Sequence, residues 1–549
     1  MISLIFSIFF TNLVIFLSGK TFKYFNNNSY DDIIENCIFG SIIISFIALF
    51  LNFFFPLTPL INTAVYFAII IIFFFKKNKI LNKKDFFFLI ITVFFTFILI
   101  SFSTINRPDA GLYHLPFTQI LNENKLILGL SNIHFRFGHT SIIQYLSAIN
   151  FNILFDKSAV VLPLASFVSF LYIYFIFEVY KLIKNLDKLN VNSFFCLTIL
   201  IYISLNMNEY GNFGNDTPAH LLFFFLISKV LKHDGSYSSF KKIFLSSIYI
   251  FLQKITLGLV LLFPVILILK DKYKFHKIII SFPSFFLLLW IFKNILISSC
   301  IIYPIKSTCF EILPWNDSNE IHEQAIAGEA WSKAWPENKD PTLTQKEFIK
   351  NFTWIKSWSE KHLRYISKII LPYSLLLIIT FIIIIWRGGK VKKIILIKRE
   401  NYKLYSIIGI CTLGVIIFFL KFPLYRYGYS YLIILLGITF SLLIKRYSPL
   451  NLIKVSKFIF FLFFIIIISK QALRMIKYYD NRSLMPQIAY FDAIGSTNYD
   501  YQEIYISDNF KIFYINKECM YKKAPCTNNL KKNIFHKEIF NYHVIVNRK

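Results

Sequence analysis

The stretch FFFLIITVFFTFILISFS, residues 86–103, is apolar over nearly its whole length, and the polar stretch RPDAGLYHLP follows it at residues 107–116. A helix needs about 20 predominantly apolar residues to cross the hydrocarbon layer of a membrane. The chain has 549 residues, of which 56% are hydrophobic and only 16% are charged, whereas soluble domains average about 25% charged. Apolar blocks of this length recur along the chain, so the sequence predicts an all-α polytopic membrane protein.

We predict about 14 transmembrane helices in three regions of the chain. Extra spans occupy 1–85, a transmembrane core with outer loops 104–157 and 298–366 occupies 86–470, and a small, mostly β module occupies 471–549. The predicted spans are 2–18, 37–55, 61–75, 86–103, 158–180, 193–207, 217–231, 241–252, 255–269, 278–297, 367–386, 404–420, 427–444 and 458–470.

The charge pattern indicates a membrane orientation rather than nucleic-acid binding. The formal net charge is +29, but the lysines and arginines gather in short clusters between apolar runs, as at 76–84, 270–277 and 387–399. Such clusters are retained on the cytoplasmic side of a membrane. We therefore expect a multi-pass protein of a bacterial inner membrane, with both large loops and the C-terminal module in the periplasm.

Two features of the outer regions carry structural predictions. Cys300 with Cys309, and Cys519 with Cys526, are close pairs expected to form disulfides in an oxidising periplasm. The segment 141–155 is too short and too polar for a span, since Ser141, Gln144, Ser147 and Asn150 recur at helical spacing, and we expect an interfacial helix there. In the C-terminal module, YQEIYISD and FKIFYIN are typical of a β-hairpin, and FNYHVIVN of another strand.

Ionisable residues at membrane depth are costly and are therefore candidates for function. Four polar islands lie on the predicted outer side, and their candidate residues are Asp109, His114, His134 and Arg136 in the first, Asp216 in the second, Lys254 in the third and Arg426 in the fourth. Asp216 also suits the N-cap of a helix, Lys254 could snorkel from an interrupted helix, and Arg426 stands among tyrosines typical of a membrane interface. The Asp and His residues could hold a divalent metal ion, although no ligand spacing requires one.

The motif Y-H-L-P…G-L-x-N-x-H-x-R-F-G, at 113–116 and 129–138, resembles a bacterial membrane-protein family of GT-C type. The pieces CIIYPIKSTCF, FPLYRYGYSY and APCT fit the same family, and the wider arrangement is similar to GT-C membrane glycosyltransferases. This resemblance implies a polyprenyl-phosphate sugar donor, an acceptor hydroxyl approached from outside, and an acidic catalytic residue in the first loop. That role transfers to Asp109 alone. Many relatives carry two adjacent acids here, whereas Ala110 follows Asp109, so Asp109 is either the base or an orienting group.

The function expected from these features is an inverting sugar transfer on the outer face. Asp109 would take the acceptor proton, while Arg426 and Lys254 would stabilise the departing lipid phosphate. His114, His134 and Arg136 would shape the pocket, and Asp216 would face the same cavity. Two alternatives stay open: a lipid-linked sugar transporter or flippase, and a polymerase or ligase of surface polysaccharide.

Overall fold

The computed structural model describes residues 2–22, 30–76, 81–101, 108–155, 157–184, 190–208, 210, 213–350, 352–386, 401–446, 452–478, 501–529 and 533–547. The N-terminal half contains α1 (Ile2–Thr21), α2 (Tyr30–Asn52), α3 (Pro59–Phe75), α4 (Lys83–Ile100), η1 (Ala110–His114), α5 (Leu115–Glu123), η2 (Leu130–Asn132), η3 (Phe135–His139), α6 (Ile142–Ala148), η4 (Lys157–Val161), α7 (Leu162–Ile183), α8 (Val191–Asn206), α9 (Asp216–Leu231), α10 (Tyr237–Gln253), η5 (Ile255–Leu261) and α11 (Leu262–Asp271). The predicted basic cluster at 387–399 lies outside the described residues.

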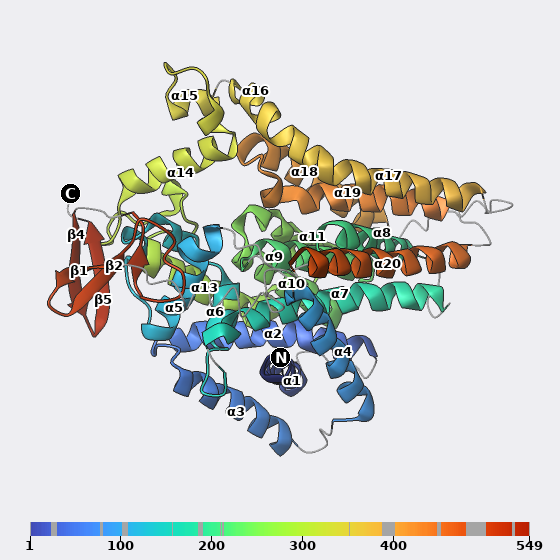
Figure 1. Cartoon of the computed structure of the whole chain (residues 1–549), viewed down its shortest axis with the longest axis horizontal. Helices are drawn as coiled ribbons and strands as arrows, with labels where there is room; N and C mark the ends of the chain where they lie inside the picture. Colours follow the sequence, from blue (N-terminus) through green and yellow to red (C-terminus); the bar gives the residue numbers. More distant parts are fainter. Residues whose placement is uncertain are drawn as a thin grey trace.

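The C-terminal half adds more helices and all of the named strands. They are α12 (Phe275–Ile279), α13 (Phe282–Ser298), η6 (Lys306–Thr308), α14 (Ser318–Ser332), η7 (Trp335–Glu337), α15 (Gln345–Lys350), α16 (Trp354–Trp358), η8 (Ser359–Leu363), α17 (Arg364–Trp386), α18 (Asn401–Lys421), α19 (Tyr425–Arg446), α20 (Leu452–Tyr478), β1 (Gln502–Ser507), β2 (Phe510–Tyr514), β3 (Cys526–Thr527), β4 (Ile534–Ile539) and β5 (Tyr542–Asn547). In Figure 1 the strands lie at one end of the long axis, and α7, α17 and α20 extend toward the other end.

Seven helices within the described ranges are long and apolar enough to cross a membrane. They span Ser3–Thr21, Ile33–Asn52, Ala159–Ile183, Trp354–Ile383, Tyr402–Lys421, Tyr425–Ile444 and Ser456–Arg474. The predicted number of about 14 exceeds the seven that meet this criterion in the described ranges, although every predicted span overlaps a described helix. The difference lies in length: α9, with 16 residues, rises only about 24 Å, and the predicted span 255–269 is divided between η5 and α11.

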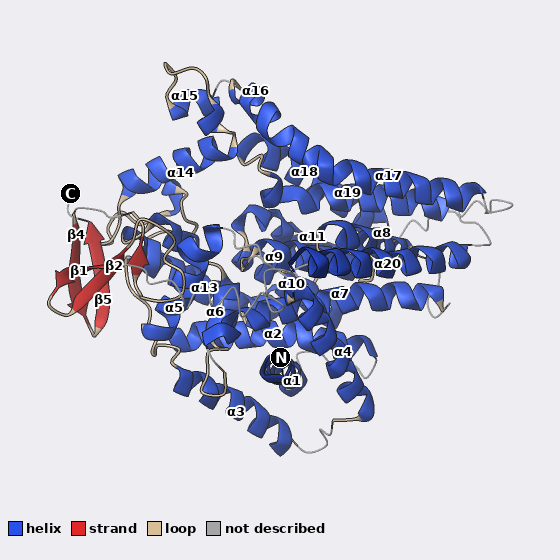
Figure 2. Cartoon of the chain, in the orientation of Figure 1, coloured by secondary structure: helices blue, strands red, loops and turns tan. Residues whose placement is uncertain are grey.

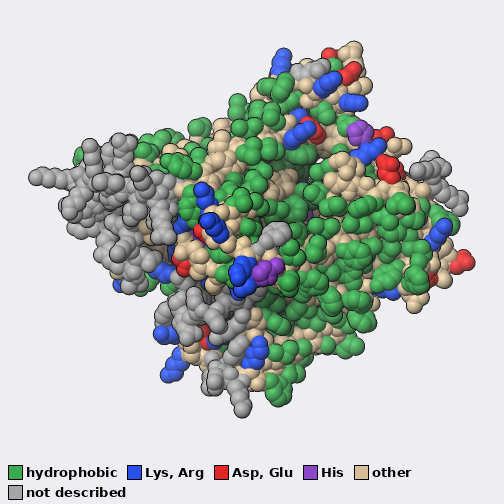
Figure 3. Space-filling model, turned by 180° about the vertical axis from the view of Figure 1, so that it is seen from behind, with side chains coloured by type: hydrophobic (Ala, Val, Ile, Leu, Met, Phe, Trp, Pro, Cys, Tyr) green, Lys and Arg blue, Asp and Glu red, His purple; other side chains and the backbone are tan. Residues whose placement is uncertain are grey.

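The surface is consistent with a protein embedded in a membrane. Figure 3 shows a broad face of hydrophobic side chains, with charged side chains gathered mainly toward its edges. On α17 and α20, large apolar residues such as Leu375, Ile382 and Phe461 are more than half exposed. Continuous apolar surface of this extent is unfavourable in water and marks a partner or a membrane.

The segment between α4 and α7 folds into a compact layer of short helices. It contains η1, α5, η2, η3 and α6, and α6 packs against α2, α5, α7 and α10. The predicted interfacial helix is therefore wrong in its placement, because every residue of α6 is buried. The polar residues of this segment bind other protein groups instead: Asn150, two residues beyond α6, accepts hydrogen bonds from Thr11 and Tyr66 and donates to the carbonyl of Ala159.

The C-terminal module contains two small sheets, seen as the red arrows of Figure 2. β1 and β2 form the expected antiparallel hairpin, β3 adds to β2 in parallel, and β4 pairs with β5. The module docks on the layer of short helices, where Leu128 forms a parallel bridge with Val544. The N-terminal helices are equally integrated, since α1 packs against α4 and α7 as well as against α2 and α3.

Candidate functional site

Asp109 and Arg426 form an ion pair although 317 positions separate them in the chain. Asp109 precedes η1, and Arg426 is the second residue of α19. The Nη1 atom of Arg426 donates to Oδ2 of Asp109 at 2.5 Å, and the two side chains are 25% and 24% exposed. Both members of the pair are therefore partly exposed.

A second ion pair adjoins the first one. Lys254 Nζ donates to the carboxylate of Asp216 and, at 2.6 Å, to the backbone carbonyl of Arg426. Lys254 stands at the break between α10 and η5, as the interrupted apolar pattern predicted. Asp216 is the first residue of α9 rather than its N-cap, which is Asn215. The ends of α9, α10 and α19, together with the start of η1, therefore bring two carboxylates and two cations together.

The guanidinium of Arg426 has hydrogen-bonding capacity that the protein does not use. Its Nε atom is buried and has no hydrogen-bond partner among the described residues. A buried donor without a partner is costly, so such atoms in a native structure call for a ligand, a water molecule or a functional explanation. A planar guanidinium can offer two donors at once to a phosphate or a carboxylate.

Aromatic rings surround the two ion pairs. The Arg426 guanidinium lies 5.3 Å from the ring centroid of Tyr427 and 5.9 Å from that of Trp331, and Lys254 Nζ lies 5.2 Å from Tyr427. Arg136 reaches the same surroundings, because its guanidinium lies 5.7 Å from the ring of Tyr113. Trp331, on α14, is half exposed and could stack on the apolar face of a sugar ring.

His114 is buried beside the ion pairs and is neutral at physiological pH. Its side chain is 4% exposed, and this burial lowers its pKa to about 4 although the nearby carboxylates of Asp109 and Asp216 act in the opposite direction. Its Nδ1 atom lies 3.0 Å from the amide nitrogen of Gln144. Because that amide nitrogen donates, the neutral ring carries its proton on Nε2.

His134 belongs to a different environment. Its Nδ1 atom accepts from the backbone N–H of Arg136 at 3.1 Å, and its Nε2 atom lies 3.0 Å from Asn528 Oδ1 in the C-terminal module. Both ring nitrogens are thus engaged at the interface with that module. The predicted substrate-binding role of His134 gains no support from these contacts.

His220 was not among the candidates predicted from the sequence. It binds the backbone of Arg426. Its Nε2 atom lies 2.9 Å from the carbonyl of Arg426, its Nδ1 atom lies 2.8 Å from Ser430 Oγ, and its ring centroid lies 3.8 Å from that of Tyr429. The spacing of Asp216 and His220, i and i+4 on one helix, places both on the same face. That spacing was the signal that could have identified His220.

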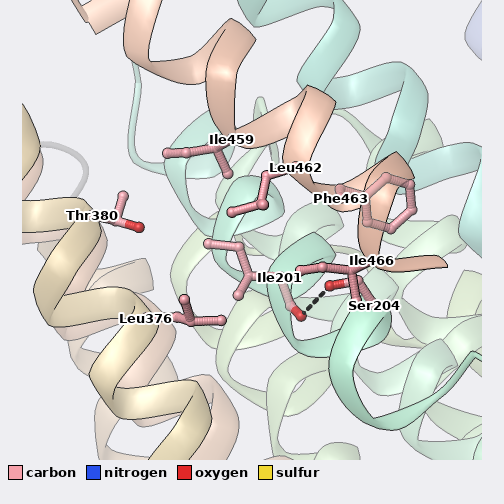
Figure 4. A pocket seen from close by; sticks show the side chains of 8 residues that line it. All are labelled: Ile201, Ser204, Leu376, Thr380, Ile459, Leu462, Phe463 and Ile466. Atoms are coloured by element: carbon pink, nitrogen blue, oxygen red, sulfur yellow. Dashed lines mark hydrogen bonds between the residues drawn. The ribbon is translucent and has the colours of Figure 1, made fainter. Parts of the chain in front are cut away.

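Tyrosines connect this site to an apolar cavity. The ring of Tyr429 stacks on Tyr425 with centroids 4.9 Å apart, and the hydroxyl of Tyr425 lies 3.0 Å from that of Tyr202. Tyr202 is the chain neighbour of Ile201, which lines a small cavity of about 20 Å³ between α8, α17 and α20 (Figure 4). The lining residues are Ile201, Ser204, Leu376, Thr380, Ile459, Leu462, Phe463 and Ile466.

Both expected disulfides are present, Cys300–Cys309 and Cys519–Cys526. In the part of the chain that the structure describes, no three His, Cys, Asp or Glu side chains are placed to hold a metal ion. The sequence allowed a divalent metal ion as a possibility, and the described residues offer no set of ligands for one.

Residues 1–433 match the sequence model of a family described as a domain of unknown function, DUF8201. No curated protein and no solved structure matches the chain.

Proposed function

We propose that this chain, which belongs to the DUF8201 family, is a GT-C-type glycosyltransferase of a bacterial inner membrane. It would transfer a sugar from a polyprenyl-phosphate donor to an acceptor hydroxyl of a cell-envelope glycan or lipid on the periplasmic side. The observation that carries the proposal is the linked set of ion pairs, Asp109 with Arg426 and Asp216 with Lys254, where the ends of α9, α10 and α19 meet the start of η1.

The reaction needs a base on one side of the sugar and cations on the other. The acceptor oxygen forms a bond to the anomeric carbon while its proton passes to Asp109. The bond between that carbon and the phosphate oxygen breaks, and its electron pair goes to the phosphate. Arg426 and Lys254 would stabilise the added negative charge, a contribution that typically amounts to several kcal/mol in enzymes. Attack opposite the leaving group inverts the anomeric centre.

The Asp109–Arg426 pair also supplies an order of events. While Arg426 holds the carboxylate of Asp109, the Oδ2 atom of that carboxylate is engaged by the guanidinium and is not available to an acceptor hydroxyl. A donor phosphate would compete for the guanidinium, which can bind it through two hydrogen bonds. Binding of the donor would then release Asp109 to accept the proton of the second substrate, so that the base acts only when the leaving group is in position.

The cavity between α8, α17 and α20, at about 20 Å³, holds no lipid tail as it stands, but the tail of such a donor would meet apolar side chains if these helices moved apart. Six of its eight lining residues are apolar, and the hydroxyl of Ser204 already donates to the carbonyl of Ile201 within its own helix (Figure 4). A dry, apolar lining favours hydrocarbon. Only a few tyrosines separate it from Arg426, as expected for a donor with a charged head and an isoprenoid tail.

The test is to purify the protein with its co-extracted lipids and identify them by mass spectrometry. Wild type is compared with Asp109→Asn, and with Asp340→Asn as a control, because Asp340 is an exposed acid that binds only its local turn. A polyprenyl monophosphate sugar that accumulates only in Asp109→Asn supports the transferase. A diphosphate-linked oligosaccharide would indicate a polymerase or ligase, and translocation of the lipid in proteoliposomes without transfer would indicate a flippase.

A further inference from the structure

A loop of the C-terminal module contacts the helix that begins at Asp109. The backbone N–H of Met520 donates to the carbonyl of Gly111 at 2.8 Å. A Cβ atom on Gly111 would lie 2.4 Å from both Oε2 of Glu518 and Sδ of Met520. A larger residue at 111 would force the ends of these two side chains to move, at a point two residues beyond Asp109.

Met520 holds this position in an uncommon backbone conformation. Its φ angle is +58°, in the left-handed region that non-glycine residues rarely adopt. Residues in such conformations persist where their surroundings constrain them, and they often accompany function. The disulfide Cys519–Cys526 closes the loop that contains Met520.

The same loop also binds the far end of that helical segment. The hydroxyl of Tyr521 donates to Oδ1 of Asn122 at 2.7 Å, near the end of α5. The η1–α5 segment is thus held at both ends, by Met520 at Gly111 and by Tyr521 at Asn122. Between these contacts, η1 is a π-helical turn, an element often found at functional sites.

The module has a separate anchor that does not involve this loop. Leu128 exchanges backbone hydrogen bonds with His543 and Ile545, and the side-chain amide of Asn132 donates to the carbonyl of Ile545 at 3.0 Å. Opening the loop should therefore leave the module attached. The effect of the loop on the Asp109 segment can be measured without losing the whole module.

We propose that the disulfide-closed loop 519–526 positions the Asp109 segment, with Met520 as its principal positioning residue. By fixing Gly111, the loop sets the direction in which Asp109 leaves the start of η1 and meets Arg426. The inference rests on the proposed function only in taking Asp109 as the reacting group, because the contacts themselves involve no assumption about the reaction.

The physical test is amide hydrogen exchange in the full-length protein, followed in peptides from 108–123. We compare Cys519→Ser/Cys526→Ser with the control Cys300→Ser/Cys309→Ser, which opens the other disulfide. Only the first variant should speed exchange in 108–123, by roughly fivefold, the effect expected from losing about one buried hydrogen bond. Unchanged exchange in 108–123, with faster exchange inside 519–526, would overturn the positioning role.

The kinetic test uses Met520→Gly, which relieves the backbone conformation but removes the side-chain contact, and Met520→Leu, which restores a side chain of similar size. Met520→Gly should lower kcat about tenfold with the donor KM unchanged, and Met520→Leu should recover most of the loss. Wild-type kcat in Met520→Gly would refute the inference. If wild type transfers no sugar at all, the proposed function fails, and the exchange experiment still decides whether the loop holds the segment.

Discussion

At the level of single residues, Arg426 connects the two ion pairs of the site. Its guanidinium binds Asp109, and its backbone carbonyl accepts hydrogen bonds from Lys254 and His220. The side chain can therefore change partners while the backbone stays fixed. Such an arrangement suits the proposed reaction, in which the guanidinium would release the carboxylate of Asp109 and bind the phosphate of the donor.

Arg426→Lys tests the need for a planar fork at this position. Lysine keeps the charge but offers a single point donor group, so it cannot bind a phosphate in the bidentate way. We expect kcat for sugar transfer to fall about 10²–10³-fold, with little change in thermal stability. Radiolabelled donor in proteoliposomes provides the measurement. Arg364→Lys, at an exposed position at the start of α17, is the matched control, and an equal loss in both variants would contradict the assignment.

His114 makes the folded protein sensitive to acid. Burial lowers its pKa to about 4 from an ordinary value of 6.5, so between these values the unfolded chain binds a proton that the folded protein resists. Above pH 6.5 His114 is neutral in both the folded and the unfolded chain, so it does not lower the free energy of unfolding. As pH falls from 6.5 toward 4, the free energy of unfolding decreases, because only the unfolded chain binds the proton. The full effect is about 3 kcal/mol at most.

The measurement is the Tm of the purified protein at intervals between pH 7.5 and pH 4.5. His114→Gln should flatten the acid-side decline of Tm, because an amide does not titrate in this range. His322→Gln replaces an exposed histidine and should keep the wild-type decline. A decline that is equally steep in all three proteins would show that other groups cause it.

At the level of helices, the sequence predicted which helix ends carry polar residues. It did not predict which of these helix ends lie next to one another in the fold. The break at Lys254 and the start of α9 at Asp216 follow from local patterns of apolar and capping residues. No local pattern relates Asp109 to Arg426, because their proximity depends on how α19 packs against the rest of the core. The burial of α6 was missed for the same reason: its polar residues bind neighbouring helices rather than lipid headgroups.

The Asp216–Lys254 pair gives a prediction for the junction of α9 and α10. Removing one member leaves the other charge without its partner, which costs about 3–5 kcal/mol for fully buried pairs. Asp216 is 32% exposed, so we expect a smaller cost of about 2 kcal/mol for Lys254→Met alone. The double variant Asp216→Asn/Lys254→Met should recover at least half of that loss, as measured by thermal unfolding in detergent. Additive losses would show that the two residues are not coupled.

At the level of the whole molecule, the sequence predicted the helical class, the β module and both disulfides, because these depend on composition and on short-range pattern. It predicted more spans than the seven long apolar helices found among the described residues, since an apolar run does not reveal whether its helix is long enough to cross a membrane. It also separated the C-terminal module from the core, whereas Leu128, Asn132 and His134 all bind that module. Such docking depends on complementary surfaces that appear only once both parts have folded.

The orientation in the membrane leads to the last prediction, which concerns Asp340 and Asp234. Both are exposed, Asp340 beyond α14 and Asp234 in the short connection between α9 and α10. If the basic clusters face the cytoplasm, as the charge pattern predicts, the first lies in the periplasm and the second in the cytoplasm. The free cysteines among the described residues, Cys37, Cys196 and Cys411, are buried, so added cysteines should label above a low background.

Asp340→Cys should therefore react with a membrane-impermeant maleimide in intact spheroplasts, and Asp234→Cys only after the membrane is permeabilised. The two exposed positions serve as controls for each other, because labelling of both in intact cells would reveal leakage. The reverse pattern would place the Asp109–Arg426 site on the cytoplasmic face. A lipid-linked donor presented in the periplasm could not reach it there, and the proposed reaction would have to be abandoned.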